Sequence, residues 1–451
     1  MALAAFVAGV WLARRPHPWR PPSGGPAFAP CTYGGYVRAW CADLAAPARL
    51  HVAVLPATER PARGALFYLE GGPGGAATAA AVRVDDLFAR VERTRDVVLV
   101  DQRGTGGSDA LACPPERVPA AAATAVAAYV RRCFQGLGDR ARLDTTAAAA
   151  DDLDAVRRIL GYGPVDVYGG SYGATLAQAF LLRHPSSVRT AVLDSGSLAG
   201  VPVYEREAAN AQHALAAIFA RCRAQAACRR AFPRSSAEVA AVLARGTHRV
   251  ELTTGPVLLT PLALAWTIEV LSQTAEGAAT LPLALHRAAR GDYTDLALAY
   301  AAELGPALDA RSRLAMFWTI LCGEPWARQR ATVADGGYLG TAVAARARVF
   351  ARACRFVPAE RGASTVRAVP THVPVLLLAG SADPLDPPAN LAGWRRQFPA
   401  GKLVVVPGAG HGTIEYGCVQ VVVARFVARG SADGLDASCV RRIALPSFET
   451  G

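Results

Sequence analysis

The chain has 451 residues, more than the roughly 250–300 that one hydrophobic core usually holds, so we expect a large core with an insertion, or two domains. Hydrophobic residues make up 52% of the chain and charged residues 19%, which excludes a disordered, collagen-like or coiled-coil protein. The formal net charge is +12, but the arginines are scattered among alanines. This pattern favours a solvated surface over a nucleic-acid-binding patch.

The ten cysteines form no CxxC pair, and no histidine stands near them at zinc-finger spacing, so we expect no metal site. Their even number favours disulfides and therefore an oxidising compartment, which places the protein outside the cell or in the cell envelope. The alternative is that they are small buried hydrophobic residues of a cytosolic protein. They are Cys31, Cys41, Cys113, Cys133, Cys222, Cys228, Cys322, Cys354, Cys418 and Cys439.

The N-terminal segment, residues 1–30, is consistent with export. Residues 1–13 are apolar but too few to span a bilayer comfortably, and Arg14 and Arg15 follow this run instead of preceding it. Residues 17–30 are rich in proline and glycine, which indicates a linker. We expect a signal peptide or an anchor here, with a misassigned start as the alternative, and no later membrane span.

After the linker, strand-like runs alternate with helical patterns, which predicts an α/β fold with a mostly parallel sheet. Residues 31–200 form the first half of this core. Residues 146–160 are predicted to be a helix, with Thr146 as its N-cap and Asp154 paired with Arg158 four residues later. The predicted strands of this half are Leu50–Leu55, Ala65–Leu69, Val97–Val100, Val165–Tyr168 and Thr190–Leu193.

Between residues 201 and 367 alanine-rich helical segments replace the alternation, which predicts an inserted helical cap. The strand pattern returns at Val373–Ala379 and Leu403–Val406, and a final helix is expected at Val419–Ala428. Residues 368–451 therefore form the second half of the core, and the cap interrupts one sheet.

A glycine-rich turn with a central serine, Gly169-Gly170-Ser171-Tyr172-Gly173, follows the predicted strand Val165–Tyr168 and precedes a predicted helix, Ala174–Arg183. Glycines allow a sharp turn that raises the serine hydroxyl above the sheet, and the helix points its first N–H groups at negative charge. The motif alone occurs often by chance. Its strand and helix context favours Ser171 as a catalytic nucleophile over a structural turn.

A serine hydroxyl needs a base to take its proton. His411 lies in the turn 408–412, directly after the predicted strand Leu403–Val406, and open α/β sheets place their sites at such carboxyl ends of strands. The other histidines lie in segments with no comparable turn, and we expect them to be surface or core residues. His411 is the predicted base.

The base needs an acid to fix its tautomer. Asp383 follows the predicted strand Val373–Ala379, and Asp386 is the competing carboxylate. We prefer Asp383 because it lies nearer the strand end. The alternative for Asp383 is a turn residue with no catalytic part.

Acyl transfer also needs N–H groups that stabilise an oxyanion. Tyr172, the residue after the nucleophile, supplies one, and the loop 71–75 supplies another from Gly72, with Gly74 as the alternative.

Asp101 and Arg103 follow the next strand. We interpret them as an ion pair that shapes the floor of the site, and the alternative is a direct catalytic part.

The segments GGPGG from Gly71, DQRGTGGS from Asp101, GGSYG around Ser171, GSADP around Asp383 and GAGHG around His411 occur in this order. As a set they resemble the prolyl aminopeptidase group of α/β-hydrolases, and most of all its secreted actinobacterial branch, the tripeptidyl-aminopeptidase-like proteins. The resemblance covers about residues 31–439, loosely in the helical insertion. It implies an α/β-hydrolase fold, a triad of Ser171, Asp383 and His411, and a cap that selects peptides with a free amino terminus.

The resemblance further implies disulfides between successive cysteines: Cys113–Cys133, Cys222–Cys228, Cys322–Cys354, Cys418–Cys439 and, as the fifth, Cys31–Cys41.

There is one departure, because many prolyl aminopeptidases have a histidine before the Gly-Gly-Pro segment, where this chain has Glu70. An exopeptidase of this kind also needs buried acids in the cap to pair with the substrate ammonium group. The first candidate is Glu324, since the neighbouring Cys322 would anchor it and related proteins carry an acid here; a surface position is its alternative. Glu205, Glu207 and Glu269 are further candidates.

We therefore expect a serine hydrolase without metal or organic cofactor that cleaves peptides one to three residues from a free amino terminus. Peptide substrates are the expected partners, with no nucleic acid and no stable membrane span beyond a candidate N-terminal anchor. An esterase with the same triad is the first alternative, because the cap alone selects the substrate. A non-catalytic binding protein of the same fold is the second, and the intact triad argues against it.

Overall fold

The structure, a computed structural model, describes residues 19, 21, 25–45, 48–114, 123–309, 311–324, 337–358 and 370–451. The predicted signal peptide or anchor and most of the linker after it lie outside these residues. Among the helices of the described ranges, none combines the length and the apolar character that a bilayer crossing requires.

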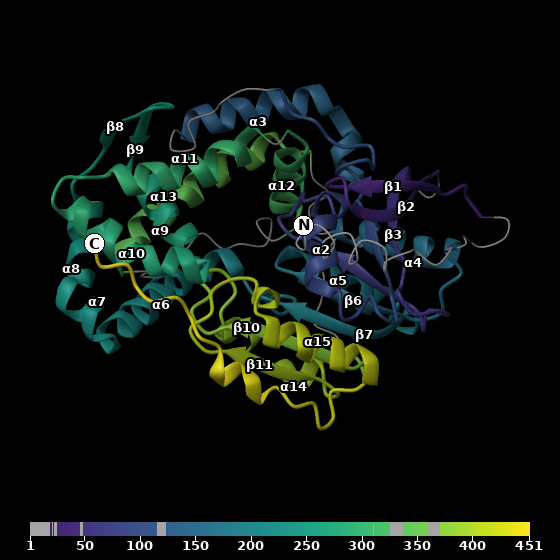
Figure 1. The fold of residues 1–451 in the computed structure, drawn as a ribbon. Coiled ribbons are helices and arrows are strands. Elements are labelled where there is room, and N and C mark those ends of the chain that lie inside the picture. The colour runs from purple at the N-terminus through teal and green to yellow at the C-terminus, as the bar shows by residue number, and fades with distance from the viewer. Residues whose placement is uncertain are drawn as a thin grey trace, which may run out of the picture.

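The described residues form a nine-stranded sheet in the order β1-β2-β3-β5-β4-β6-β7-β10-β11 (Figure 1). Six of these strands, β5, β4, β6, β7, β10 and β11 in sheet order, run parallel to one another. The other three, β1, β2 and β3, extend one edge of the sheet in antiparallel fashion. The strands are β1 (Ala29–Tyr33), β2 (Val37–Leu44), β3 (Leu50–Leu55), β4 (Ala65–Leu69), β5 (Asp96–Val100), β6 (Val165–Gly170), β7 (Val188–Asp194), β10 (Val375–Gly380) and β11 (Lys402–Val406).

Each predicted strand is present, with ends within two residues of those predicted. The hairpin of β1 and β2 was not predicted, and the predicted linker overlaps β1 at residues 29 and 30. The strand signal is weak in this hairpin because β1 lies largely exposed at the sheet edge, while β2 places small residues such as Ala39 and Ala42 among its buried positions.

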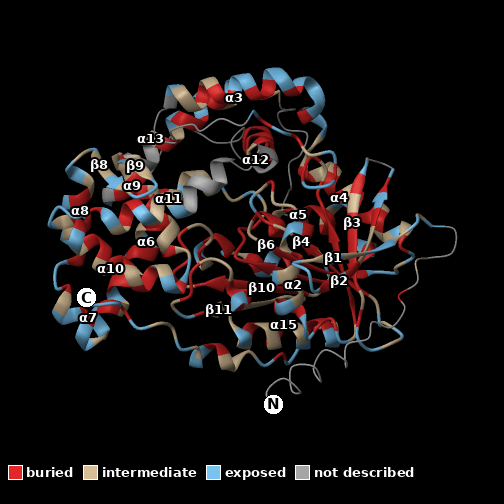
Figure 2. Cartoon of the chain, turned by 45° about the horizontal axis from the view of Figure 1, so that its top comes forward, coloured by how far each residue is buried: buried red, intermediate tan, exposed pale blue. Residues whose placement is uncertain are grey.

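Helices cover both faces of the sheet, and the alternation of side chains along each strand divides the core in two. On β4, Phe67 and Leu69 pack with helices α4 (Thr146–Ile159) and α5 (Tyr172–Arg183). Leu66 and Tyr68 point the other way and pack with α2 (Ala81–Phe88) and α15 (Gly417–Arg429). Figure 2 shows the result as a band of buried residues along the sheet. Because helices cover both faces, side chains on both sides of each parallel strand are buried, which explains why these strands are continuous apolar runs.

The start of α4 differs from the prediction. Thr145, not Thr146, is the N-cap, since its hydroxyl accepts a hydrogen bond from the amide of Ala148 at 3.1 Å. The predicted pairing of Asp154 with Arg158 on this helix is confirmed, at 3.0 Å.

The segment between β7 and β10 is largely helical, as Figure 1 shows at the side of the sheet opposite β1. It also contains a hairpin, β8 (His248–Leu252) with β9 (Gly255–Leu259), that was not predicted. The helices are α6 (Val203–Ala224), α7 (Ala226–Ala231), α8 (Ser235–Ala244), α9 (Pro261–Ser272), α10 (Ala275–Ala289), α11 (Thr294–Asp309), α12 (Arg311–Gly323) and α13 (Gly337–Ala353).

Two segments from outside this insertion join it. Helix α3 (Ala123–Leu137) packs on α12 and α13, where Tyr129 and Phe134 share one apolar cluster with Met316 and Phe350. After α15, the chain crosses from the sheet to α10 (Figure 1), and we name its residues 443–451 the C-terminal strap. The insertion is thus held by more than its own two connections to the sheet.

Phe448 fastens the strap to the insertion. It is buried with residues of α6 and α10, and the guanidinium of Arg221 lies 4.2 Å from the centre of its ring. The same guanidinium donates to the carbonyl of Pro446 at 3.1 Å, and the amide of Glu449 donates to the carbonyl of Ala279 at 3.1 Å.

Five disulfides are present, and they join the pairs that the resemblance implies. Each pairs a cysteine with the next one along the chain, and the described residues include no free cysteine. Disulfides of this number are typical of proteins that reside in an oxidising compartment.

Candidate active site

Ser171 lies between β6 and α5 in a backbone conformation that non-glycine residues rarely adopt, with φ 55° and ψ −124°. Its amide donates to the carbonyl of Asp194 at 2.9 Å, which ties the turn to the end of β7. A Cβ atom on Gly169 would lie 2.1 Å from the carbonyl oxygen of Gly173, and one on Gly173 would lie 2.2 Å from that of Leu69. Both glycines are therefore required for the sharp turn that presents the serine.

Asp383 and His411 are joined at the carboxyl ends of the neighbouring strands β10 and β11. The Nδ1 atom of His411 lies 2.9 Å from Oδ2 of Asp383, whose side chain is fully buried. The other oxygen, Oδ1, accepts from the amides of Leu385 and Asp386 at 2.8 and 2.9 Å. The carboxylate is thus fixed in place, and it fixes the ring tautomer that leaves Nε2 able to accept a proton.

The competing carboxylate, Asp386, makes no hydrogen bond to His411 in the structure. Its Oδ1 accepts from the hydroxyl of Ser197 instead. Burial, together with the charge of Asp383, raises the pKa of Asp386 to about 6.

Three carboxylates surround His411. Burial acts to lower the pKa of this imidazole, but the charge and hydrogen bond of Asp383, with the charges of Asp386 and Asp194, outweigh it and raise the pKa to about 9. The imidazolium that forms when a serine hydroxyl loses its proton is therefore stabilised at this position.

Two residues at the end of β7, Asp194 and Ser195, hold the loop that follows His411, and sequence reasoning missed both. Asp194 is fully buried and accepts from the amides of Thr413 and Ile414 at 3.0 and 2.9 Å. The hydroxyl of Ser195 accepts from the amide of Gly412 at 2.8 Å. Their position directly after the predicted strand Thr190–Leu193 could have identified them, since the same kind of position indicated the other site residues.

The glycine loop after β4 packs against the serine turn, since a Cβ atom on Gly71 would lie 3.3 Å from that of Ser171. Gly72 lines the cavity beside Ser171 and Tyr172, whereas Gly74 does not. Glu70 accepts from the amide of Gly71 at 2.9 Å and from the hydroxyl of Tyr68 at 2.9 Å. Its carboxylate thus anchors the start of this loop.

The predicted ion pair between Asp101 and Arg103 is wrong. Arg103 pairs with Asp152 of α4, at 2.6 and 2.7 Å. Asp101 accepts instead from the amide and hydroxyl of Thr78 and from the amide of Gly107. The two side chains thus have separate partners on different segments.

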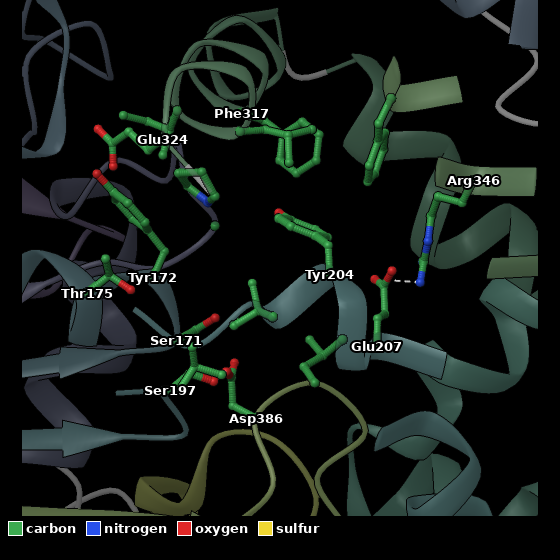
Figure 3. Close-up of a pocket in the computed structure, with 18 of the residues that line it drawn as sticks. Ser171, Tyr172, Thr175, Ser197, Tyr204, Glu207, Phe317, Glu324, Arg346 and Asp386 are labelled. Atoms are coloured by element: carbon green, nitrogen blue, oxygen red, sulfur yellow. Dashed lines mark hydrogen bonds and ion pairs between the residues drawn. The ribbon is translucent and has the colours of Figure 1, made fainter. Parts of the chain in front are cut away.

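A cavity of about 310 Å³ opens between Ser171 and the helical insertion. Figure 3 shows Ser171 and Asp386 on one side of it, Tyr204 in the middle, and Glu207 with Arg346 on the far side. Apolar residues from α6, α9, α12 and α13 form much of its wall, Trp266, Phe317, Ile320 and Phe350 among them. Such a mixture of apolar walls and a few charged groups is typical of a small-molecule or peptide site.

The far side of this cavity holds a buried cluster of two acids and one base. Arg346 of α13 lies 2.5 Å from Glu207 of α6 and 2.9 Å from Glu269 of α9. Burial raises the pKa of Glu207 to about 7, with Arg346 opposing and the charge of Glu269 adding to the effect. With both acids ionised the cluster carries one net negative charge inside the protein.

Glu324, the first acid suggested by the sequence, lines the same cavity and is 6% exposed. Its two oxygens accept from the amide and the hydroxyl of Thr146, at 2.8 and 2.6 Å. That hydroxyl also contacts the phenol oxygen of Tyr172 at 2.8 Å. Glu205, in contrast with Glu207 and Glu269, is not among the residues that line the cavity.

Comparison with known proteins identifies the fold family. A protein-family model described as "alpha/beta hydrolase fold" matches residues 64–417. The chain belongs to this family. The predicted fold class is thereby confirmed.

The similar curated proteins include tripeptidyl aminopeptidases and proline iminopeptidases. The tripeptidyl aminopeptidase of Streptomyces lividans is 33% identical over 152 residues, which are 30% of this chain and 28% of the relative. The proline iminopeptidase of Neisseria gonorrhoeae is 29% identical over 130 residues, 28% of this chain and 31% of the relative. The matched part is thus less than one third of each relative's length.

Among solved structures, the proline iminopeptidase of Mycobacterium smegmatis aligns over 87% of this chain and 98% of its own, at 17% identity and a TM-score of 0.42.

Proposed function

We propose that this α/β-hydrolase is a secreted or cell-envelope serine aminopeptidase that releases one to three residues from the free amino terminus of peptides. The observation that carries the proposal is the placement of Ser171 and the acidic cluster of Glu207 and Glu269 on one cavity. The partial similarity to tripeptidyl aminopeptidases and proline iminopeptidases supports the same reading. The five disulfides support an extracytoplasmic location.

In the proposed mechanism, Oγ of Ser171 attacks the scissile carbonyl carbon while Nε2 of His411 takes the hydroxyl proton. The amides of Tyr172 and Gly72 donate to the oxyanion. Protonated His411 then gives its proton to the leaving amine. In the second half, His411 deprotonates a water molecule that hydrolyses the acyl-enzyme, and Asp383 stabilises the imidazolium throughout.

We propose that the substrate ammonium group binds at the far side of the cavity, at Glu207 and Glu269. One guanidinium serves both carboxylates, so the cluster retains a net negative charge that a buried ammonium group would neutralise. Glu324 lines the wall nearer Tyr172, and its oxygens already accept from Thr146. It is therefore the second candidate for this role, and residues 201–367 are the proposed cap.

The test compares hydrolysis of free and N-acetylated alanine, proline and trialanine anilides with that of short p-nitrophenyl esters, by the oxidised protein. We expect the free-amino substrates to be cleaved, the acetylated ones to be poor substrates, and the Ser171→Ala variant to be inactive on all of them. Labelling by a fluorophosphonate probe should likewise require Ser171. Absence of labelling in the wild-type protein would favour a non-catalytic binding protein.

The matched variants test the ammonium site. Glu207→Gln should lower kcat/KM for free-amino substrates about 10- to 100-fold, equivalent to about 1.4–2.7 kcal/mol, and leave the esters nearly unchanged. Glu205→Gln removes the same charge two residues away and off the cavity wall, so it should have little effect. If only esters are hydrolysed, the protein is a carboxylesterase, which the apolar part of the wall would also suit. If acetylation makes no difference to cleavage of the anilides, the protein has no ammonium site.

A further inference from the structure

A second cavity, of about 410 Å³, is lined by the proposed base. Its wall includes His411, Tyr416, Glu276 of α10 and Leu445 of the C-terminal strap, but not Ser171. Gln273, at the end of α9, lines both cavities. The two cavities therefore meet the catalytic groups from different directions, the first at the nucleophile and the second at the base.

The chemistry of peptide cleavage indicates which part of the substrate would lie near the second cavity. The acyl part of the substrate stays on Ser171, whereas the amine that leaves must take its proton from His411. The residues that follow the cleaved bond consequently extend away from Ser171 past His411. A cavity lined by His411 and not by Ser171 lies on that side.

The walls of the second cavity are built from fixed segments. Leu445 of the strap packs so closely on the loop before His411 that a Cβ atom on Gly408 would lie 2.5 Å from its Cδ1. The neighbouring Pro446 is held by Arg221 at 3.1 Å. On the opposite wall, the hydroxyl of Thr274 caps α10 by accepting from the amide of Gly277 at 3.0 Å. The strap thus completes a preformed cavity.

The charge of this cavity is acidic. Apart from His411, the charged side chains that the described part of the chain places on its wall are Glu276 and Glu415, and both are exposed. Arg83 pairs with Glu415 at 3.2 Å but also with Glu70 at 3.2 Å, so this one guanidinium faces two carboxylates. Another nearby cation is Arg221, which is held at Pro446 and against the ring of Phe448. The exposed carboxylates of Glu276 and Glu415 are therefore the charged groups that an entering basic side chain would meet on the wall.

We propose that the second cavity binds the peptide segment that follows the cleaved bond, and that Glu276 and Glu415 favour a basic residue there. The proposal rests on the aminopeptidase function proposed above and adds a preference on the leaving side of the substrate.

The test uses free-amino peptides that differ only in the residue after the cleaved bond, which is arginine, serine or glutamate, with products identified by mass spectrometry at low ionic strength. For the wild-type protein we expect kcat/KM to fall in that order, with about a fivefold difference between arginine and glutamate, since exposed charge pairs have modest effects. The ratio should approach one in the double variant Glu276→Gln, Glu415→Gln. It should invert in the double variant Glu276→Lys, Glu415→Lys.

The control is Glu251→Gln, which removes an exposed carboxylate of β8 that lies on neither cavity and should keep the wild-type ratio. Equal rates for the three peptides, or a preference that survives both double variants, would overturn the proposal. These outcomes are distinct from failure of the proposed function, which would appear as no cleavage of free-amino anilides by the wild-type protein and overturns both.

Discussion

The backbone amide of His411 donates a hydrogen bond to the carbonyl oxygen of Gln273, 2.7 Å away. Gln273 ends α9 in the helical insertion, so the loop of the proposed base and the proposed cap share a direct backbone contact. No side chain fits between them, because a Cβ atom on Gly410 would lie 2.2 Å from the same carbonyl oxygen. The position of the base and that of α9 are therefore coupled.

This coupling predicts that Gly410→Ala impairs every substrate alike. The added methyl group must move either α9 or the loop of His411, and small displacements of catalytic groups cost up to about 100-fold in rate. We expect kcat/KM to fall at least about tenfold for esters and peptides. Gly417→Ala is the matched control, since its Cβ atom meets nothing within 4 Å. Unchanged kinetics in Gly410→Ala would show that the contact does not position the base.

Glu324→Gln separates two roles of this residue. The carboxylate holds Thr146, whose hydroxyl contacts the Tyr172 side chain, and Tyr172 supplies a proposed oxyanion donor. We expect kcat to fall for esters and free-amino peptides by a similar factor, and the free energy of unfolding to fall by about 1–3 kcal/mol. Kinetics on both substrate classes and thermal unfolding provide the check. A loss confined to free-amino substrates would assign Glu324 to the ammonium group instead.

The pKa of about 9 for His411 predicts a steep pH dependence. The base acts only when neutral, and at pH 7 about one free enzyme molecule in a hundred has it neutral. For p-nitrophenyl esters, kcat/KM should rise about tenfold per pH unit from pH 6 and level off near pH 9. A level profile between pH 6 and 8 would contradict this assignment.

Free-amino peptides should show a different pH profile. Their α-amino group loses its proton near pH 8, roughly, and the ammonium form that Glu207 and Glu269 would bind then disappears. Binding of the ammonium group should also weaken at acid pH, because Glu207, with a pKa of about 7, becomes neutral below that pH. The peptide profile should therefore be bell-shaped, whereas the ester profile is not. Parallel profiles for the two substrates would argue against an ammonium site.

Phe448→Ala tests the C-terminal strap. Truncating this buried ring removes its contacts with α6 and α10 and with the guanidinium of Arg221, and we expect a loss of about 3 kcal/mol in the free energy of unfolding. Hydrogen exchange should rise at the amide of Glu449, which donates to the carbonyl of Ala279 in α10. Leu258→Ala, at a side chain that is 56% exposed, is the control and should change stability little.

The fold and the proposed triad could be predicted because their signals are local in the sequence. Ser171, Asp383 and His411 each follow directly on an apolar strand in a turn of small residues, and parallel strands bring such ends together. Asp194 carried the same signal and was missed because no glycine-rich turn marks it.

Contacts made by tertiary packing could not be predicted in this way. Arg103 pairs with Asp152, on a helix 49 residues later, rather than with its neighbour Asp101. Either of two consecutive threonines could cap α4 by its sequence. The hydroxyl of Thr146 donates instead to the carboxylate of Glu324, 178 residues away, and Thr145 is the N-cap. In both cases the partner is chosen by how helices pack, and no local pattern records it.

The disulfides have a consequence for how the chain acquires its covalent structure. Their sequence separations range from 6 to 32 residues, and the ten cysteines pair strictly in order along the chain. A polypeptide that enters an oxidising compartment in an extended form, N-terminus first, therefore presents the first cysteine of each pair with its partner as the very next cysteine to arrive. As long as each pair closes before the next cysteine arrives, the native pairing is the only one available at each step.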